Sequence, residues 1–155
     1  MYTAKEEFKE VDIKKLITQI CSDMNFKAKK YSLNIICDLC DGTVRVQESK
    51  IRQVIINVLD NAIKYSINGK NIYISSSIAE NKYIIEVVNS SEPIVQEIYD
   101  NIFEPFAKSN TNSTEDSRGM GLFLCREILN EHNGEISIEN GNEIKVKIAL
   151  NILGN

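Results

Sequence analysis

The segment that most constrains how this chain folds is residues 50–66, in which apolar side chains recur at every third or fourth position. The positions that follow this spacing are Ile51, Val54, Ile55, Val58, Leu59 and Ala62. They share one face of an α-helix, and a helix with one apolar face buries that face against other elements. Ser49 is expected to cap this helix, and the polar stretch "INGK" is expected to end it.

The remaining segments predict two more long helices and three pairs of strands. Asp12 is expected to cap a helix that runs to about residue 30, another helix is expected over residues 119–132, and "EIYDNIFEPF" predicts a short helical piece. The expected strands are residues 33–39 and 43–46, 71–79 and 82–90, and 135–140 and 143–150, joined in hairpins by "CDG", "ENK" and the two-residue turn "GN". This order predicts an α+β fold with helices on one face of a mainly antiparallel sheet.

Composition limits the classes of protein that fit the chain. With 155 residues, 43% of them apolar, a single domain over residues 1–155 is expected. The net charge of -4 gives no basic excess of the kind that binding to nucleic acid needs. No apolar run is long enough to span a membrane, and the first residues lack the apolar core of a signal peptide, so a cytoplasmic location is expected.

The four cysteines are spread over expected helices and strands, which favours free thiols over a disulfide framework. Only Cys37 and Cys40 have the spacing of metal ligands. No second pair follows them, and the chain has one histidine. Two small apolar residues that flank a turn are therefore a better interpretation than a metal site.

Three polar residues run beside the apolar face of the helix over residues 50–66. Asn57, Asn61 and Lys64 are spaced i, i+4 and i+7, so they form one stripe at the edge of the buried face. Such a stripe can point into a cleft, where amide oxygens suit Mg²⁺ and a lysine suits phosphate. An ordinary solvated helix face is the alternative, and this segment alone does not decide between the two.

Two glycines, Gly119 and Gly121, stand at the start of the last expected helix. Glycine lets backbone N–H groups approach a ligand closely, and the N-terminus of a helix favours an anion such as phosphate. Glycines near helix starts are also common without any ligand. The polar stretch before them, "AKSNTNSTEDSR", is long for a loop, which predicts a functional or a disordered segment.

In combination these stretches resemble a known family. The stretches "RQVIINVLDNAIKYS", "NIFEPF" and "GMGLFLCREILNEHNG", with the lead-in "EFKEVDIKKLI", are similar in order and separation to the ATP-binding catalytic domain of bacterial sensor histidine kinases. That domain belongs to the ATPase superfamily of gyrase, heat-shock chaperones and histidine kinases. The resemblance implies its Bergerat fold, a two-layer α/β sandwich with a mixed, mostly antiparallel sheet and a mobile lid.

The resemblance implies ATP and Mg²⁺ as cofactors and gives roles to residues 57–66, which match the family's N-box. Asn61 is implied as the Mg²⁺ ligand, with Asn57 beside it. Lys64 is implied to reach the phosphates, and Tyr65 to lie against the nucleotide. Asn57, Asn61 and Lys64 are the catalytic set that follows from this match.

The family's lid corresponds to residues 107–118, and its glycine box to residues 117–122. Ser117 and Arg118 stand where the glycine box usually has Gly-Thr, and Arg118 can itself meet a phosphate. The other residues that the resemblance places at the nucleotide in this region are Phe106, Lys108, Gly119, Met120, Gly121 and Leu122.

The adenine box departs from the family pattern. Where the family usually has Asp-x-Gly-x-Gly-Ile, residues 89–94 read Asn-Ser-Ser-Glu-Pro-Ile. Asn89 can still accept a hydrogen bond from the adenine amino group, without the charge of an aspartate, and Ile94 keeps the family's residue. Ser91 and Pro93 replace the two glycines, which removes backbone freedom where close approach is expected. Weakened adenine recognition is expected.

Asn57 and His132 bear on the type of reaction. Superfamily members that hydrolyse ATP, and the anti-sigma serine kinases, have a glutamate general base at the position of Asn57, where an amide cannot take a proton. The resemblance therefore favours phosphoryl transfer to a histidine that another domain supplies. His132 closes a helix where the family has a structural histidine, so a structural role is favoured over that of phosphoacceptor.

Two functions are expected. The first is the catalytic domain of a two-component sensor histidine kinase, monomeric by itself, with the parent's dimerisation domain and a response regulator as partners. The second is a binding module of the same fold with little kinase activity, which the altered adenine box suggests. An anti-sigma serine kinase would need another general base in place of Asn57. Sensors of this family are often anchored in the cell membrane by other domains.

Overall fold

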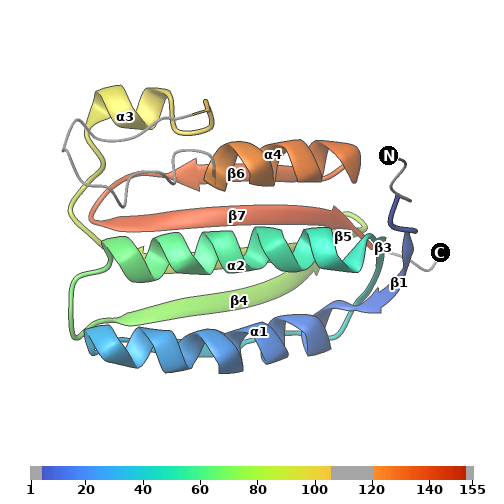
Figure 1. The fold of residues 1–155 in the computed structure, drawn as a ribbon, viewed down its shortest axis with the longest axis horizontal. Helices are drawn as coiled ribbons and strands as arrows, with labels where there is room; N and C mark the ends of the chain where they lie inside the picture. The colour runs from blue at the N-terminus through green and yellow to red at the C-terminus, as the bar shows by residue number, and fades with distance from the viewer. Residues whose placement is uncertain (1–4, 106–120, 153–155) are drawn as a thin grey trace.

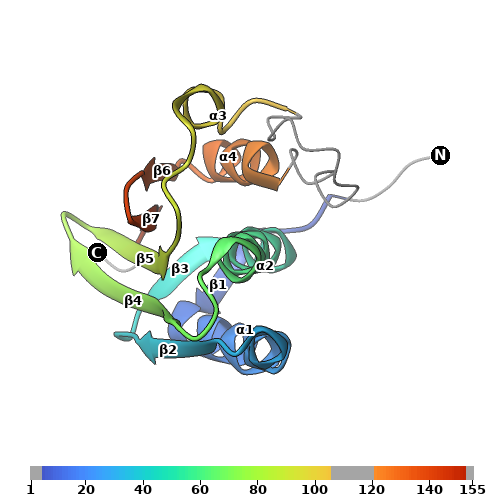
Figure 2. The same ribbon diagram turned by 90° about the vertical axis from the view of Figure 1, so that its left-hand side faces the viewer.

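The computed structural model describes residues 5–105 and 121–152. In this part of the chain, α1 (Ile13–Ala28), α2 (Glu48–Tyr65) and α4 (Gly121–Glu131) lie on one face of a five-stranded sheet (Figure 1 and Figure 2). The strand order is β2 (Asn34–Asp38), β4 (Asn71–Ala79), β5 (Lys82–Ser90), β7 (Glu143–Asn151) and β6 (Glu135–Glu139). β2 pairs with β4 in parallel and the other pairs are antiparallel, which confirms the expected mixed, mostly antiparallel sheet.

The strand pairing at the start of the chain differs from the expected hairpin of residues 33–39 with 43–46. That prediction is wrong: β2 joins the large sheet beside β4, while β3 (Thr43–Val46) pairs with β1 (Lys9–Asp12) in a separate two-stranded sheet. Gly42 precedes β3 and lies against the ring of Tyr83, where a Cβ atom would sit 2.5 Å from Cδ2. The glycine of "CDG" therefore permits close packing rather than a hairpin turn.

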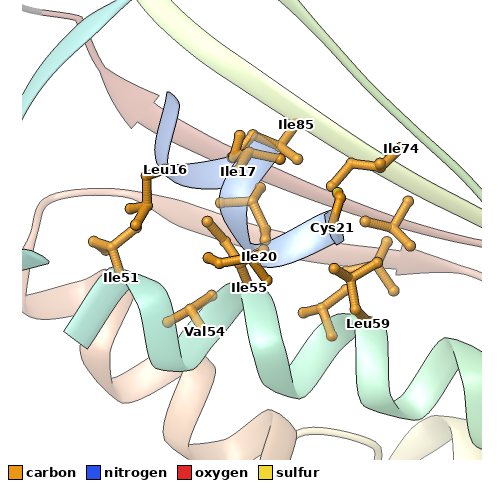
Figure 3. Packing of buried hydrophobic residues seen from close by; sticks show 14 of the residues in the cluster. Leu16, Ile17, Ile20, Cys21, Ile51, Val54, Ile55, Leu59, Ile74 and Ile85 are labelled. Atoms are coloured by element: carbon orange, nitrogen blue, oxygen red, sulfur yellow. The ribbon is translucent and has the colours of Figure 1, made fainter. Parts of the chain in front are cut away.

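The main core lies where α1 and α2 meet over the sheet (Figure 3). The side chains that meet there, each at most 3% exposed, are Leu16, Ile17 and Ile20 of α1, Ile51, Ile55 and Leu59 of α2, and Ile74 and Ile85 of the sheet. The helical spacing of the residues in α1 and α2 explains why both helices bury one face. At the solvent side of this contact, Lys27 and Asp60 form an ion pair between the two helices.

The two expected caps have different outcomes. Asp12 caps α1, because its Oδ1 accepts a hydrogen bond of 3.0 Å from the backbone N–H of Lys15. Ser49 does not cap α2: the helix begins at Glu48, and Gln47 is its N-cap residue. The backbone N–H and the hydroxyl of Ser49 instead donate to the carboxylate of Glu6. A residue of the lead-in, distant in sequence, thus fills the place that a local cap was expected to fill.

Glu6 gives the stability of the domain a pH dependence. The hydrogen bonds from the Ser49 hydroxyl and then from its backbone N–H lower the pKa of Glu6 below its usual value of 4.5. A lowered carboxyl pKa contributes stability above 4.5, and this contribution is lost as the pH falls through the folded-state pKa. Glu6→Gln is therefore expected to be less stable than the wild type at neutral pH, with a difference that shrinks to zero in acid.

Urea unfolding from about pH 7 to about pH 3.5 measures this difference. The control is Glu7→Gln, because Glu7 is an exposed neighbour in the same lead-in. A Glu6→Gln deficit that stays constant over this pH range would contradict the role given to the carboxylate.

The predictions for the two remaining hairpins have different outcomes. Glu80 and Asn81 join β4 to β5 with φ of 54° and 63°, so the expected hairpin is confirmed. The expected two-residue turn between β6 and β7 is wrong, because three residues, 140–142, separate these strands. The extra residue is Asn140, whose side chain is bound to the segment after β5.

Candidate functional site

A cavity of about 520 Å³ opens where α2 ends. Its walls come from the last turns of α2, the neighbouring ends of β5, β6 and β7, the segment around α3 (Gln96–Asp100), and the first turn of α4. The end of α2 and α3 lie at the same end of the molecule (Figure 1). The volume is within the range of pockets that hold small-molecule ligands.

Much of the cavity wall is apolar. The apolar side chains that the helices α2 and α4 and the sheet contribute are Val58, Ala62, Leu122, Ile138, Ile144 and Val146. Val58 and Ala62 continue the apolar face that the sequence predicted for α2, so one helix helps to form both the core and the cavity. A wall of this type suits a flat, weakly polar ligand group such as an aromatic base.

The polar stripe predicted on α2 lies partly in this cavity. Asn61 and Lys64 both line it and are half-buried. Tyr65 lines it as well, is 55% exposed, and has its ring centroid 5.6 Å from Lys64 Nζ. Within the described residues the side chain of Asn61 makes no hydrogen bond, so its amide is available to a ligand.

Asn57 is placed differently from the rest of the stripe. It is not among the described residues that line the cavity. Burial raises the pKa of the Cys125 thiol in α4 to about 12, and a hydrogen bond with the Asn57 side chain opposes the rise. The structure therefore brings Asn61, Lys64 and Tyr65 together at the cavity and places Asn57 against α4.

Asn89, at the end of β5, presents a buried amide to the cavity. The residue is 5% exposed, and its neighbours across the sheet are Ile72 and Ile144. Its Nδ2 lies 3.5 Å from the carbonyl oxygen of Ser90, which is the outer limit for a hydrogen bond. Within the described residues, the amide of Asn89 is thus held in an apolar setting with most of its hydrogen-bonding capacity available to a ligand.

The segment after β5 is fastened to the β6–β7 turn. The Asn140 side chain accepts a hydrogen bond of 2.8 Å from the backbone N–H of Ile94 and donates one of 2.8 Å to the Ile94 carbonyl. The Ser91 N–H donates to the Asn142 carbonyl at 3.0 Å, and the Tyr99 hydroxyl donates to the Ile138 carbonyl at 2.8 Å. These bonds hold residues 91–95 at the cavity rim although the two glycines of the family pattern are absent.

Asn140 is a residue of this site that the sequence did not predict. The turn "NGN" marked it only as part of a hairpin, and the partner of its side chain lies 46 residues away in the sequence. Its Oδ1 also accepts a hydrogen bond of 2.9 Å from Gly141, whose φ is +154°. The signal available in the sequence was an asparagine at a turn, a position where its side chain often bonds to backbone.

The other predicted site residues fall into two groups. Ile94 and Leu122 line the cavity, and Gly121 is the first residue of α4. The predictions that lie outside the described residues are the lid over residues 107–118, the start of the glycine box, and Phe106, Lys108, Arg118, Gly119 and Met120.

His132 has the structural role that the sequence favoured. It is 7% exposed, its Nε2 accepts a hydrogen bond of 3.1 Å from the backbone N–H of Gln47, and its Nδ1 lies 2.7 Å from the Ile128 carbonyl. Only a ring with the proton on Nδ1 satisfies both contacts. Phosphorylation of either nitrogen would break one of them, so this histidine is not placed to accept a phosphoryl group.

The cysteines are free thiols, as expected. Cys37 is exposed in β2, where a hydrogen bond with the buried Cys21 lowers its pKa, and Cys40 lies in the loop that follows. In residues 5–105 and 121–152 there is no group of three or more His, Cys, Asp or Glu side chains that could hold a metal ion. The helices described for this chain include none that is both long and apolar enough to cross a membrane.

Comparison with known proteins gives a consistent result. Residues 46–152 match the family described as histidine kinase-, DNA gyrase B-, and HSP90-like ATPases. The chain is 33% identical over 125 residues to the adaptive-response sensory kinase SasA of Synechococcus sp. (strain JA-3-3Ab). The aligned region covers 80% of this chain and 33% of that kinase. The chain spans about a third of the length of the first curated relatives that it matches.

Solved structures agree with the sequence comparison. The catalytic domain of histidine kinase ThkA superposes with a TM-score of 0.82 and 31% identity, covering 94% of this chain and 95% of that one. The complex of ThkA with the response regulator protein TrrA superposes with a TM-score of 0.76 and 28% identity, covering 92% of this chain and 41% of that one.

Proposed function

The chain belongs to the family of histidine kinase-, DNA gyrase B-, and HSP90-like ATPases, and we propose that it binds ATP and phosphorylates a histidine of a partner domain. It is a catalytic domain of the histidine kinase type. The observation that carries the proposal is the cavity at the end of α2, which combines an apolar wall and the buried amide of Asn89 with the side chains of Asn61 and Lys64.

The residues of the cavity suit the parts of ATP. The apolar wall formed by the sheet, α2 and α4 suits the adenine ring, and Asn89 offers an amide oxygen to its amino group. Lys64 supplies a positive charge for the phosphates. Tyr65, exposed beside Lys64, has a ring that can cover the nucleotide.

The donor set also suits Mg²⁺ held jointly with phosphate. Mg²⁺ binds few protein oxygens and keeps several waters when it accompanies a nucleotide, so a single neutral amide is an adequate protein ligand. Asn61 would hold the ion, because its side chain lines the cavity and has no hydrogen bond within the described residues. The bound ion would neutralise charge on the phosphates, and Lys64 would add to this and orient them.

The acceptor of the phosphoryl group is proposed to lie on the dimerisation domain of a parent sensor kinase. The N-box has an amide at Asn57 where a general base for hydrolysis would stand, and both ring nitrogens of His132 are engaged in the fold. A response regulator is proposed as the downstream partner, since the similar kinase ThkA has been solved with one. The domain is proposed to work in the cytoplasm, with a parent protein that other segments can anchor in a membrane.

Calorimetric titration with a non-hydrolysable ATP analogue, with and without Mg²⁺, tests this proposal. A dissociation constant in the micromolar range, tightened by Mg²⁺, is the expected result. Transfer of labelled phosphate from ATP to the parent's isolated dimerisation domain is the second measurement. Absence of nucleotide binding would reject the proposed function.

A binding module with little kinase activity is the second candidate. The observation that favours it is the replacement of two glycines by Ser91 and Pro93 at the rim of the cavity. Millimolar or absent binding of the ATP analogue, by a chain whose thermal unfolding is cooperative, would support this candidate over the first.

The Asn140 side chain with its hydrogen bonds to Ile94 and Gly141, called the Asn140 clamp below, gives a prediction of its own. Asn140→Ala removes both hydrogen bonds to Ile94 and the one to Gly141, so residues 91–95 lose their support at the cavity rim. The affinity for the ATP analogue is expected to fall by about three- to tenfold, the value of one or two neutral hydrogen bonds. Calorimetric titration measures the change.

Asn142→Ala is the matched control, because Asn142 is exposed and contacts Ser91 through its backbone carbonyl alone. It should bind the analogue as the wild type does. Wild-type affinity of Asn140→Ala would show that the clamp does not position the binding segment.

A further inference from the structure

We infer that the part of the cavity next to Asn89, where the nucleobase is proposed to bind, accepts 6-oxopurine nucleotides, such as inosine triphosphate, about as well as adenine nucleotides. The inference rests on the proposed function, because it concerns the ligand of the same cavity. Its basis is Asn89, the buried amide at the end of β5 that lines the cavity.

The chemistry of the amide differs from that of the aspartate usual at this position. A carboxylate only accepts hydrogen bonds, so it selects a 6-amino group and repels a 6-oxo group. A carboxamide has a donor and an acceptor on the same carbon and can present either one by rotating half a turn. Asn89 can therefore accept from the amino group of adenine or donate to the carbonyl oxygen of hypoxanthine.

The surroundings of Asn89 leave the rotation open. The contact from Nδ2 to the Ser90 carbonyl is 3.5 Å long, at the outer limit of a hydrogen bond, so replacing it with an approach of Oδ1 to that oxygen at this distance costs little. The strand neighbours on either side, Ile72 and Ile144, are apolar and prefer neither orientation. No other hydrogen bond of this side chain is found in the described residues.

Two further polar groups at the rim of the cavity, those of Ser91 and Ile94, are already engaged. Ser91 is the other buried polar residue that the described part of the chain places at the cavity. Its hydroxyl donates to the Glu92 carbonyl at 2.8 Å, and its N–H donates to the Asn142 carbonyl. The backbone N–H and carbonyl of Ile94 are both held by Asn140. Among the buried side chains that residues 5–105 and 121–152 contribute to the cavity, Asn89 is thus the one with both a donor and an acceptor to offer a base.

Displacement of a fluorescent ATP analogue from the full chain, in the presence of Mg²⁺, by ATP and by inosine triphosphate tests the inference. The ratio of the two dissociation constants should be below about tenfold, because one neutral hydrogen bond replaces another. A ratio above this value would overturn the inference while leaving the proposed function standing. Failure of both nucleotides, and of the labelled analogue itself, to bind would overturn the inference and the proposed function together.

Asn89→Asp is the informative variant. A carboxylate cannot donate to the 6-oxo group, so the preference for ATP over inosine triphosphate is expected to rise by at least about tenfold. An unchanged ratio in this variant would overturn the inference.

Asn89→Ala keeps the test decisive if the buried carboxylate disturbs folding, which thermal unfolding reports. This variant should bind both nucleotides more weakly, by similar factors of about three- to tenfold. Wild-type affinity of Asn89→Ala for both would show that the amide does not contact the base, and would overturn the inference.

Discussion

Replacing Asn61 with alanine is expected to weaken the binding of a non-hydrolysable ATP analogue in the presence of Mg²⁺ by on the order of 100-fold. Asn61 lines the cavity with an amide that makes no hydrogen bond within the described residues. Without this oxygen, phosphate and water alone would hold the ion. In the absence of Mg²⁺ the variant and the wild type should bind the analogue equally, because the role given to Asn61 is that of metal ligand.

Titration calorimetry with and without Mg²⁺ separates the possible outcomes. Asn130→Ala is the matched control, because it removes the same amide from an exposed position of α4. If Asn61→Ala keeps its Mg²⁺-dependent affinity, the metal assignment is wrong. An equal loss with and without Mg²⁺ would instead show that Asn61 contacts the nucleotide itself.

The helices could be predicted from the sequence because their signal is local. Residues 50–66 were expected as a helix, and α2 spans Glu48–Tyr65 with every residue of the expected apolar face buried. The cap predicted at Ser49 is wrong because its hydroxyl, which a local rule expects to accept a hydrogen bond from the first turn, instead donates to Glu6, 43 positions earlier. The sequence of a helix alone does not show that a residue distant in the chain supplies its cap.

Strand pairing was predicted where partners are adjacent and missed where they are not. β4 and β5 are joined by the two-residue turn of Glu80 and Asn81, so their pattern reveals the hairpin. β2 pairs with β4 across β3 and the whole of α2, and "CDG" looked like a hairpin turn. The contact of Gly42 with the Tyr83 ring is a tertiary requirement that no local spacing expresses.

For the candidate site, the sequence identified residue types and the structure supplied their grouping. Asn61, Lys64 and Asn89 were expected at the nucleotide, and all three line one cavity. Asn140 was missed because its partner, Ile94, is reached only through the fold. Weak adenine recognition was expected from the loss of two glycines. The hydrogen bonds from Asn140 that hold residues 91–95 in place without these glycines could not be predicted from the sequence.

The largest effect on stability is expected from Leu59→Ala. Leu59 is 0% exposed and lies in the core between α1, α2 and the sheet (Figure 3). Removal of a fully buried leucine side chain leaves a cavity that close-packed neighbours fill only in part. The free energy of unfolding is expected to fall by about 3 kcal/mol, and the midpoint of thermal unfolding by about 10 °C.

Urea unfolding followed by circular dichroism measures this loss, with Ile78→Ala as the control. Ile78 is 50% exposed in β4, so its truncation leaves no enclosed cavity and should cost less than about 1 kcal/mol. A loss below about 1 kcal/mol for Leu59→Ala would mean that the contact between α1 and α2 adjusts to the missing volume.

The same variant tests whether the packing of α2 in the core can be separated from its role at the cavity. Leu59, Val58 and Ala62 all belong to the core, and of these three only Val58 and Ala62 also line the cavity. At a temperature where Leu59→Ala remains folded, its affinity for the ATP analogue should therefore match that of the wild type. A fall in affinity under these conditions would mean that packing against α1 determines where α2 places Asn61 and Lys64, and that the core and the nucleotide site are coupled through this helix.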